Sequence, residues 1–241
     1  MLLNILVPPP RYPSEASPLR AAASRRDQLF PWQIAAVKRR HALLLDGGFV
    51  LKRLRHRLGR SADAADVQTE WQRIGRHPLL ADSELLRVFY YDAPPAVGTI
   101  TNPFDGKSED LARTPQHAHA RALHDRLALL PDTALRMGET VVRGWHVRPE
   151  TVRDIARRGR SLEATDLRLV IEQKGVDLRI GLDIARLSLL HLVDAVVVVT
   201  ADRDLVPAFR FARREGLRLY LDHLGSKVVH RDLIAHADRV L

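Results

Sequence analysis

Residues 195–204 read Ala-Val-Val-Val-Val-Thr-Ala-Asp-Arg-Asp, a short apolar stretch that runs directly into acidic residues. An unbroken run of β-branched residues is typical of a strand buried on both faces of a parallel sheet. Apolar residues recur at helical spacing on either side, over Leu178–Leu190 and Arg203–Arg214, and Leu217–Leu221 is a second apolar strand. Helix, strand, helix and strand in this order predict right-handed crossovers and a parallel sheet.

The first half of the chain carries the same pattern. Ala42–Leu45 is an unbroken apolar run that ends at Asp46-Gly47-Gly48, and leucines recur at helical spacing after it. Further elements are expected as a helix over 63–75, a strand over 85–92, a helix over 116–130 and a strand over 139–147. The sequence therefore predicts an α/β protein with a three-layer α/β/α fold and a central, mostly parallel sheet.

Composition narrows the class of protein. The chain has 241 residues, of which 46% are hydrophobic and 28% charged, so we expect a folded, soluble, cytoplasmic protein with no membrane partner. It has 0 cysteines, which excludes disulfides, Cys-ligated zinc and a cysteine nucleophile. The net charge of +9 suits a polyanionic partner, although a GC-rich coding sequence explains the many arginines equally well.

Composition also divides the chain into three parts. Residues 1–40 contain three consecutive prolines and clustered arginines, and we expect a flexible basic arm there. Residues 41–224 form the predicted domain, with a loop insertion near 94–115 that is rich in turn formers. Residues 225–241 are expected to form a C-terminal helical extension packed on the domain.

Acidic residues follow three of the predicted strands. Asp46 follows the first strand, Asp92 ends the strand over 85–92, and Asp202 and Asp204 follow the strand that opens this section; Asp177 begins a helix. Ligands of an open parallel sheet bind beyond the carboxyl ends of its strands. Acids gathered at one edge repel one another unless a cation binds, and Mg²⁺ or Mn²⁺ prefers carboxylate oxygen. This pattern predicts a divalent-cation site.

Each acid also has a purely structural explanation. Asp177 would serve as a helix N-cap, Asp204 as a carboxylate in the first turn of a helix, and Asp92 as a turn former. Asp183 would pair with Arg179 or Arg186 on one helix. The motifs of P-loop, dinucleotide-binding and serine-hydrolase sites are absent from the sequence, so the cation site is the stronger hypothesis.

Five short segments carry a resemblance to a known family: Leu45–Phe49, Tyr90–Pro94, Gln173–Arg179 with Asp183, Val199–Pro207 and Ala212–Gly216. Through them, residues 41–224 resemble the NYN domain, the LabA-like branch of the PIN-like nuclease superfamily. The resemblance implies a PIN-like, Rossmann-like fold and metal-dependent ribonuclease chemistry. Two residues depart from the family's pattern, since Ala201 replaces a glycine and Leu205 a phenylalanine.

We therefore expect a ribonuclease, or phosphodiesterase, that cleaves RNA at a Mg²⁺ or Mn²⁺ site. The residues expected to be catalytic and to hold the metal are Asp46, Asp177, Asp202 and Asp204, with Asp183 as a less certain metal ligand. Those expected to contact substrate are Lys174, Arg203, Thr200 and Gly47. Two alternatives stay open, a non-catalytic RNA-binding or regulatory module on the same fold and a small-phosphoester hydrolase that uses the same acids. The sequence also allows a homo-oligomer.

Overall fold

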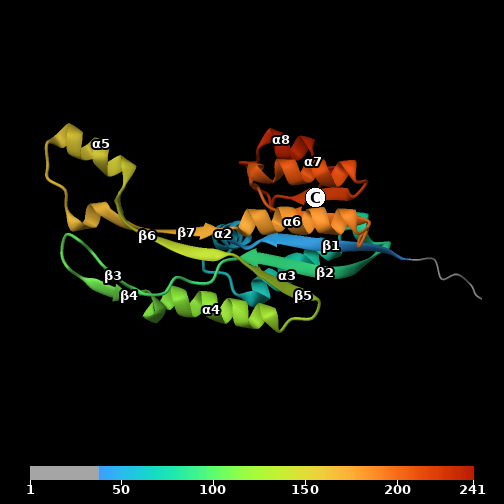
Figure 1. Ribbon diagram of the computed structural model, residues 1–241, viewed down its shortest axis with the longest axis horizontal. Coiled ribbons are helices and arrows are strands. Elements are labelled where there is room, and N and C mark those ends of the chain that lie inside the picture. The colour runs from blue at the N-terminus through green and yellow to red at the C-terminus, as the bar shows by residue number, and fades with distance from the viewer. Residues whose placement is uncertain (1–37) are drawn as a thin grey trace, which may run out of the picture. The chain divides into compact units, whose positions relative to one another are not determined.

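A computed structural model describes residues 38–241, so nearly all of the expected arm at 1–40 lies outside the described residues. The described part contains a six-stranded sheet of strand order β10-β9-β8-β1-β2-β5, in which every neighbouring pair is parallel (Figure 1). Its strands are β1 (Arg39–Asp46), β2 (Ser83–Asp92), β5 (Thr133–Met137), β8 (Ala195–Val199), β9 (Arg218–Asp222) and β10 (Arg239–Val240).

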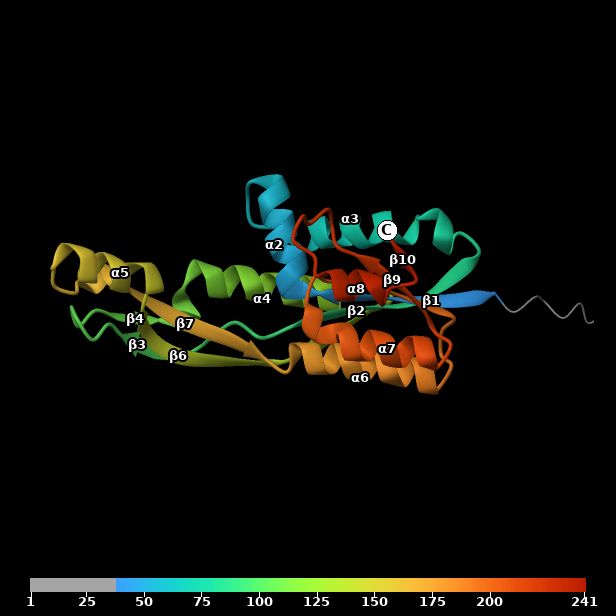
Figure 2. The ribbon, with the colours of Figure 1, turned by 90° about the horizontal axis from the view of Figure 1, so that it is seen from above.

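Helices cover both faces of this sheet. On one face lie α2 (Gly47–Leu58), α3 (Ala64–Gly75) and α4 (Pro115–Ala128), and on the other lie α6 (Val176–Leu189), α7 (Val206–Arg214) and α8 (Arg231–Ala235). Figure 2 shows α2 and α3 on the side of the sheet opposite α6 and α7. The predicted three-layer α/β/α arrangement with a central parallel sheet is confirmed.

Strand β1 shows how the sequence builds two cores. Residues 41–45 of this strand are buried, and alternate side chains of a strand point to opposite faces. Leu43 and Leu45 join the core that contains Trp71 of α3, whereas Ala42 and Leu44 join the core that contains α6 and α7. This burial on both faces accounts for the unbroken apolar run in the sequence.

The sheet extends on both sides of β1. β2 and β5 are added on one side of β1, and β8, β9 and β10 are added on the other. In sheets of this kind, ligands bind beyond the carboxyl ends of the strands at the point where the strand order reverses. Asp46 ends β1, and Asp202 and Asp204 follow β8, so all three lie at this reversal point.

Two hairpins lie outside the main sheet. β6 (Glu139–Val147) and β7 (Leu167–Lys174) pair in antiparallel fashion, with α5 (Pro149–Arg158) between them. Both views show this ribbon extending beyond the carboxyl end of the sheet (Figures 1 and 2). The smaller hairpin joins β3 (Thr99–Thr101) to β4 (Ser108–Asp110). The strand expected over 139–147 is therefore present but belongs to the ribbon, and the insertion near 94–115 contains a hairpin.

Several boundaries differ from the predicted ones. The first strand begins at Arg39, inside the segment assigned to the arm. The segment 225–241 is not a helical extension, because only α8 is helical and β10 then pairs with β9 as an edge strand. The helix expected over Arg203–Arg214 is divided into a 3₁₀ turn, η4 (Arg203–Leu205), and α7. In residues 38–241, no helix is both long and apolar enough to cross a bilayer.

Candidate functional site

Asp46 is held at the junction of β1 and α2. It is the N-cap of α2, and its Oδ1 accepts a hydrogen bond of 3.1 Å from the backbone N–H of Phe49. Its Oδ2 accepts a bond of 3.0 Å from the hydroxyl of Thr200, which is fully buried directly after β8. Thr200, expected to contact substrate, is thus a positioning residue for the Asp46 carboxylate.

The same hydroxyl connects Asp46 to the acids that follow β8. The backbone N–H of Asp202 donates to Thr200 Oγ1 at 3.1 Å. Asp202 is in turn the N-cap of η4, and its Oδ1 accepts from the backbone N–H of Asp204 at 2.8 Å. Asp202 and Asp204 therefore lie in a tight turn whose geometry is tied to the end of β1.

Four carboxylates act on one another electrostatically. The pKa of Asp46 is raised from 3.8 to about 6, first by burial and further by the charges of Asp177 and Asp202. The pKa of Asp177 is raised by partial burial and by the charges of Asp202 and Asp204. The N-cap of α6 is Gly175. Asp177 therefore does not have the N-cap role that would have explained it without a ligand. In residues 38–241, none of these four acids forms an ion pair with a basic side chain.

We call Asp46, Asp177, Asp202 and Asp204 the acidic cluster. Carboxylates that repel one another and lack basic partners are a donor set that suits a hard divalent cation such as Mg²⁺ or Mn²⁺. As the side chains of residues 38–241 stand, no three His, Asp or Glu converge closely enough to hold an ion. Asp177 and Asp204 are exposed, and exposed side chains change rotamer rapidly, so only the chemistry of the donor set, and not its present geometry, suits a cation.

Asp183 does not join the acidic cluster. Its Oδ2 accepts hydrogen bonds from Tyr91 Oη at 2.8 Å and from Arg136 Nε at 3.0 Å. The carboxylate thus ties α6 to β2 and β5. Asp183 is therefore not placed as the expected metal ligand. It does not pair with Arg179 or Arg186 either, because its hydrogen bonds come from residues distant in the sequence.

Of the three other expected substrate contacts, two have other surroundings and one remains open. Gly47 is buried, and a Cβ built there would lie 2.6 Å from the carbonyl oxygen of Tyr91, so the glycine allows α2 to pack against β2. Lys174 forms an ion pair of 3.0 Å with Glu172 on the same strand. Arg203 is exposed in η4, between Asp202 and Asp204, and remains available to a ligand.

A buried polar network behind the cluster was not predicted. Asp92, only 5% exposed, contacts His124 Nε2 of α4 at 2.9 Å and accepts from Gln173 Nε2 of β7 at 2.6 Å. The turn-forming role suggested for Asp92 is only part of its function, because it also joins the sheet to α4 and to the ribbon. No local spacing signals this network, since its members lie far apart in the sequence.

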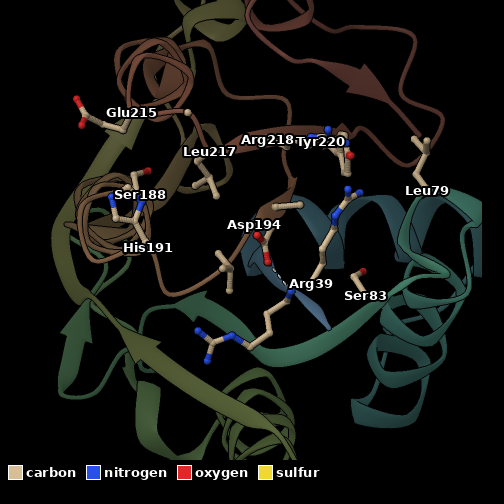
Figure 3. Close-up of a pocket in the computed structure, with 14 residues that line it drawn as sticks. Arg39, Leu79, Ser83, Ser188, His191, Asp194, Glu215, Leu217, Arg218 and Tyr220 are labelled. Carbon is tan, nitrogen blue, oxygen red and sulfur yellow. Dashed lines mark hydrogen bonds between the residues drawn. The ribbon is translucent and has the colours of Figure 1, made fainter. Parts of the chain in front are cut away.

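The opposite edge of the sheet holds a different cavity. Its volume is about 280 Å³, and its walls come mainly from the amino ends of β1, β8 and β9. Figure 3 shows Arg39, Arg218 and Asp194 at this cavity. Its lining mixes basic and acidic side chains and contains no member of the acidic cluster. The acidic cluster therefore belongs to the carboxyl edge and is separate from this cavity.

No family model matches the chain. A comparison with curated proteins gives no match either. Among solved structures, the chain is similar to a protein of unknown function, VPA0982, from Vibrio parahaemolyticus RIMD 2210633. The TM-score is 0.49 at 16% sequence identity, and the match covers 86% of this chain and 94% of that one. We draw no function from this likeness.

The raised pKa of Asp46 predicts that Asp46→Asn stabilises the protein above pH 6 in the absence of a cation. Between the unfolded and folded pKa values the native state holds a proton that the unfolded chain releases, so the free energy of unfolding falls as pH rises from about 4 to about 6. A shift of this size corresponds to at most about 3 kcal/mol. Asn retains the oxygen that caps α2.

Melting temperatures in EDTA at about pH 4 and about pH 7.5 test this prediction. The melting temperature of the variant should exceed that of the natural protein only at the higher pH. Mg²⁺ or Mn²⁺ added there should raise the melting temperature of the natural protein and leave that of the variant nearly unchanged. An equal difference between the two proteins at both pH values would contradict the assignment.

Proposed function

We propose that the protein is a metal-dependent ribonuclease that acts at the acidic cluster. One observation carries this proposal. Four aspartates that form no ion pair within residues 38–241 lie at the carboxyl edge of a parallel sheet, next to the reversal of strand order where ligands bind. Their repulsion costs stability unless a cation offsets it, and a bound divalent cation would supply that compensation.

The chain's own residues have distinct roles in this proposal. Asp46, Asp177, Asp202 and Asp204 would hold Mg²⁺ or Mn²⁺. A divalent ion bound there lowers the pKa of water and offsets negative charge on a phosphoryl group. Thr200 orients Asp46 through the 3.0 Å hydrogen bond.

Two further features favour RNA as the substrate. The net charge of +9 attracts a polyanion, and the five segments that resemble NYN domains include all four acids. The departures from that pattern lie beside the cluster. Leu205 is buried in the core, with 2% exposure, so its replacement of phenylalanine changes packing. Ala201 is partly exposed next to Asp202, where its methyl group narrows the approach of a substrate.

A second candidate is a non-catalytic RNA-binding module on the same fold. It is favoured by the observation that the carboxylates of residues 38–241 do not converge on one point. Such a module would retain RNA affinity with a strong dependence on salt and would release no product. In such a module the acidic cluster would have no catalytic role.

Cleavage of a mixed-sequence, single-stranded RNA by the purified full chain tests the proposal. The RNA is incubated with Mg²⁺, with Mn²⁺ and with EDTA, beside an equal amount of the Asp46→Asn variant to reveal contaminating nuclease. We expect cleavage with at least one metal, none in EDTA and little by the variant. Salt-sensitive binding without any cleavage would instead support the RNA-binding module, and turnover of mononucleotide esters alone would support a small-phosphoester hydrolase.

A further inference from the structure

A cavity of about 760 Å³ opens beside the acidic cluster. Gly48, two residues after Asp46, lies on its wall. The remaining walls come from α2, the segment that follows β2, α4 and the β6–β7 ribbon. The volume lies within the range of about 300–1,000 Å³ that is typical of small-molecule sites, so one nucleotide is an occupant of suitable size.

Apolar side chains line a large part of this cavity. Pro94, Pro95 and Ala96 follow β2, Leu111 precedes α4, and Ile171 lies on β7. Ile171 is 43% exposed although it is a large aliphatic residue. Such a surface contacts a flat, weakly polar face favourably, and an unstacked nucleobase exposes two such faces.

One wall of the cavity is basic. Lys52 and Arg55 lie three residues apart on α2, and therefore on the same face of that helix. Both are exposed, and neither forms an ion pair within residues 38–241. Two neighbouring arginines of the same helix are engaged by the fold, since Arg53 donates to the carbonyl oxygen of Leu224 and Arg57 pairs with Glu70. Within residues 38–241, Lys52 and Arg55 are thus the unpaired cations of α2 that face the cavity, where they complement phosphate, whereas the acidic residues of the lining, Asp92 and Glu109, lie on β2 and β4.

No member of the acidic cluster lines the cavity, but Gly48 on its wall adjoins Asp46. A Cβ built at Gly48 would lie 3.7 Å from Asp46 Oδ1 and 3.6 Å from Gln173 Oε1. Gln173 is held in place by its 2.6 Å hydrogen bond to the buried Asp92. A strand whose phosphate lies at the cluster therefore has this cavity immediately beside it, with Gln173 at the junction.

We propose that this cavity binds an unpaired nucleotide of the RNA strand, next to the phosphate at the acidic cluster. The base packs on the apolar wall, and Lys52 and Arg55 contact the adjoining phosphates. This inference rests on the proposed function and narrows it to single-stranded substrate. A paired base is stacked and must leave the duplex before it can enter such a pocket, which costs free energy.

Binding of a short fluorescein-labelled RNA strand and of its blunt duplex, followed by anisotropy in EDTA, tests the charged wall. The single strand should bind more tightly. In the Lys52→Gln/Arg55→Gln variant, the slope of log affinity against log salt for the single strand should be shallower by about 1.4, because about 0.7 is lost per phosphate contact. The control variant Arg76→Gln/Arg87→Gln removes the same charge from exposed arginines elsewhere and should leave the slope nearly unchanged.

The apolar pocket is tested by blocking it from α4. Ala120 lines the cavity, whereas Ala122 on the same helix is exposed and does not. Ala120→Glu should weaken single-strand binding at least about tenfold relative to Ala122→Glu, which carries the same added charge. Equal melting temperatures of the two variants confirm that folding is not the cause. Binding of a free nucleoside monophosphate in preference to the strand would overturn the proposal.

The outcomes separate this inference from the proposed function. If RNA is cleaved in a metal-dependent way but neither the Lys52/Arg55 variant nor Ala120→Glu alters single-strand binding, the cavity assignment is overturned and the nuclease stands. Equal affinity for strand and duplex would overturn it in the same way. If both variants weaken binding and no metal-dependent cleavage occurs, the cavity assignment stands and the nuclease is overturned.

Discussion

Asp202→Asn is expected to lower metal-dependent RNA cleavage by roughly 10²–10³-fold. Asp202 raises the pKa of both Asp46 and Asp177, so its carboxylate is the one that both of them sense. If the cluster binds a cation as proposed, the removal of this carboxylate weakens that binding, and the cation would otherwise contribute several kcal/mol to stabilising charge at a reacting phosphate. Asn is also a good N-cap, so the turn that Asp202 makes with Asp204 is preserved.

The measurement is the initial rate of RNA cleavage at saturating Mg²⁺ or Mn²⁺, with the melting temperature recorded for each protein. Asp82→Asn is the matched control, because Asp82 is exposed, lies just before β2 at the amino edge of the sheet and is remote from the cluster. A loss of no more than a few-fold in a folded Asp202→Asn protein would show that the acidic cluster is not the catalytic centre.

Gly47→Ala is expected to cause a large loss of stability. A Cβ at this position would lie 2.6 Å from the carbonyl oxygen of Tyr91 and 2.7 Å from Cζ of Tyr90. Both tyrosines are fully buried in β2, so neither can move without disturbing the core. Overpacking of this kind costs about 3 kcal/mol, which corresponds to a fall in melting temperature of about 6–12 °C for a chain of this length.

Gly48→Ala is the matched control on the neighbouring residue. There an added Cβ would meet its nearest atoms at 3.6 and 3.7 Å, which is ordinary contact, and alanine favours the helix by up to about 1 kcal/mol. Gly48→Ala should therefore melt at or above the natural temperature. If instead Gly47→Ala melts normally and loses RNA affinity, the original hypothesis that Gly47 contacts substrate is restored.

Elements with strong local signals were predictable from the sequence. The apolar runs of β1 and β8 predict strands because helices cover both faces of these strands. The run that begins at Ala195 coincides with β8, Ala195–Val199. β5 was missed because Thr133–Met137 mixes polar and apolar residues and is only half-buried at the edge of the sheet. The position of β6 outside the sheet depends on pairing with β7, which no local pattern reveals.

The sequence by itself determined the order of the acids along the chain and the parallel strands that precede Asp46 and Asp202. Because the carboxyl ends of parallel strands share one edge, these two facts bring together residues 154 positions apart, as the Thr200–Asp46 hydrogen bond shows. Only the tertiary structure decided what each side chain contacts. In the folded protein Arg136 donates a hydrogen bond to Asp183, 47 residues away, and Gln173 donates one to Asp92, 81 residues away. Gly47 also packs against β2. Such contacts depend on how helices and hairpins pack across the sheet, and residue spacing carries no record of that packing.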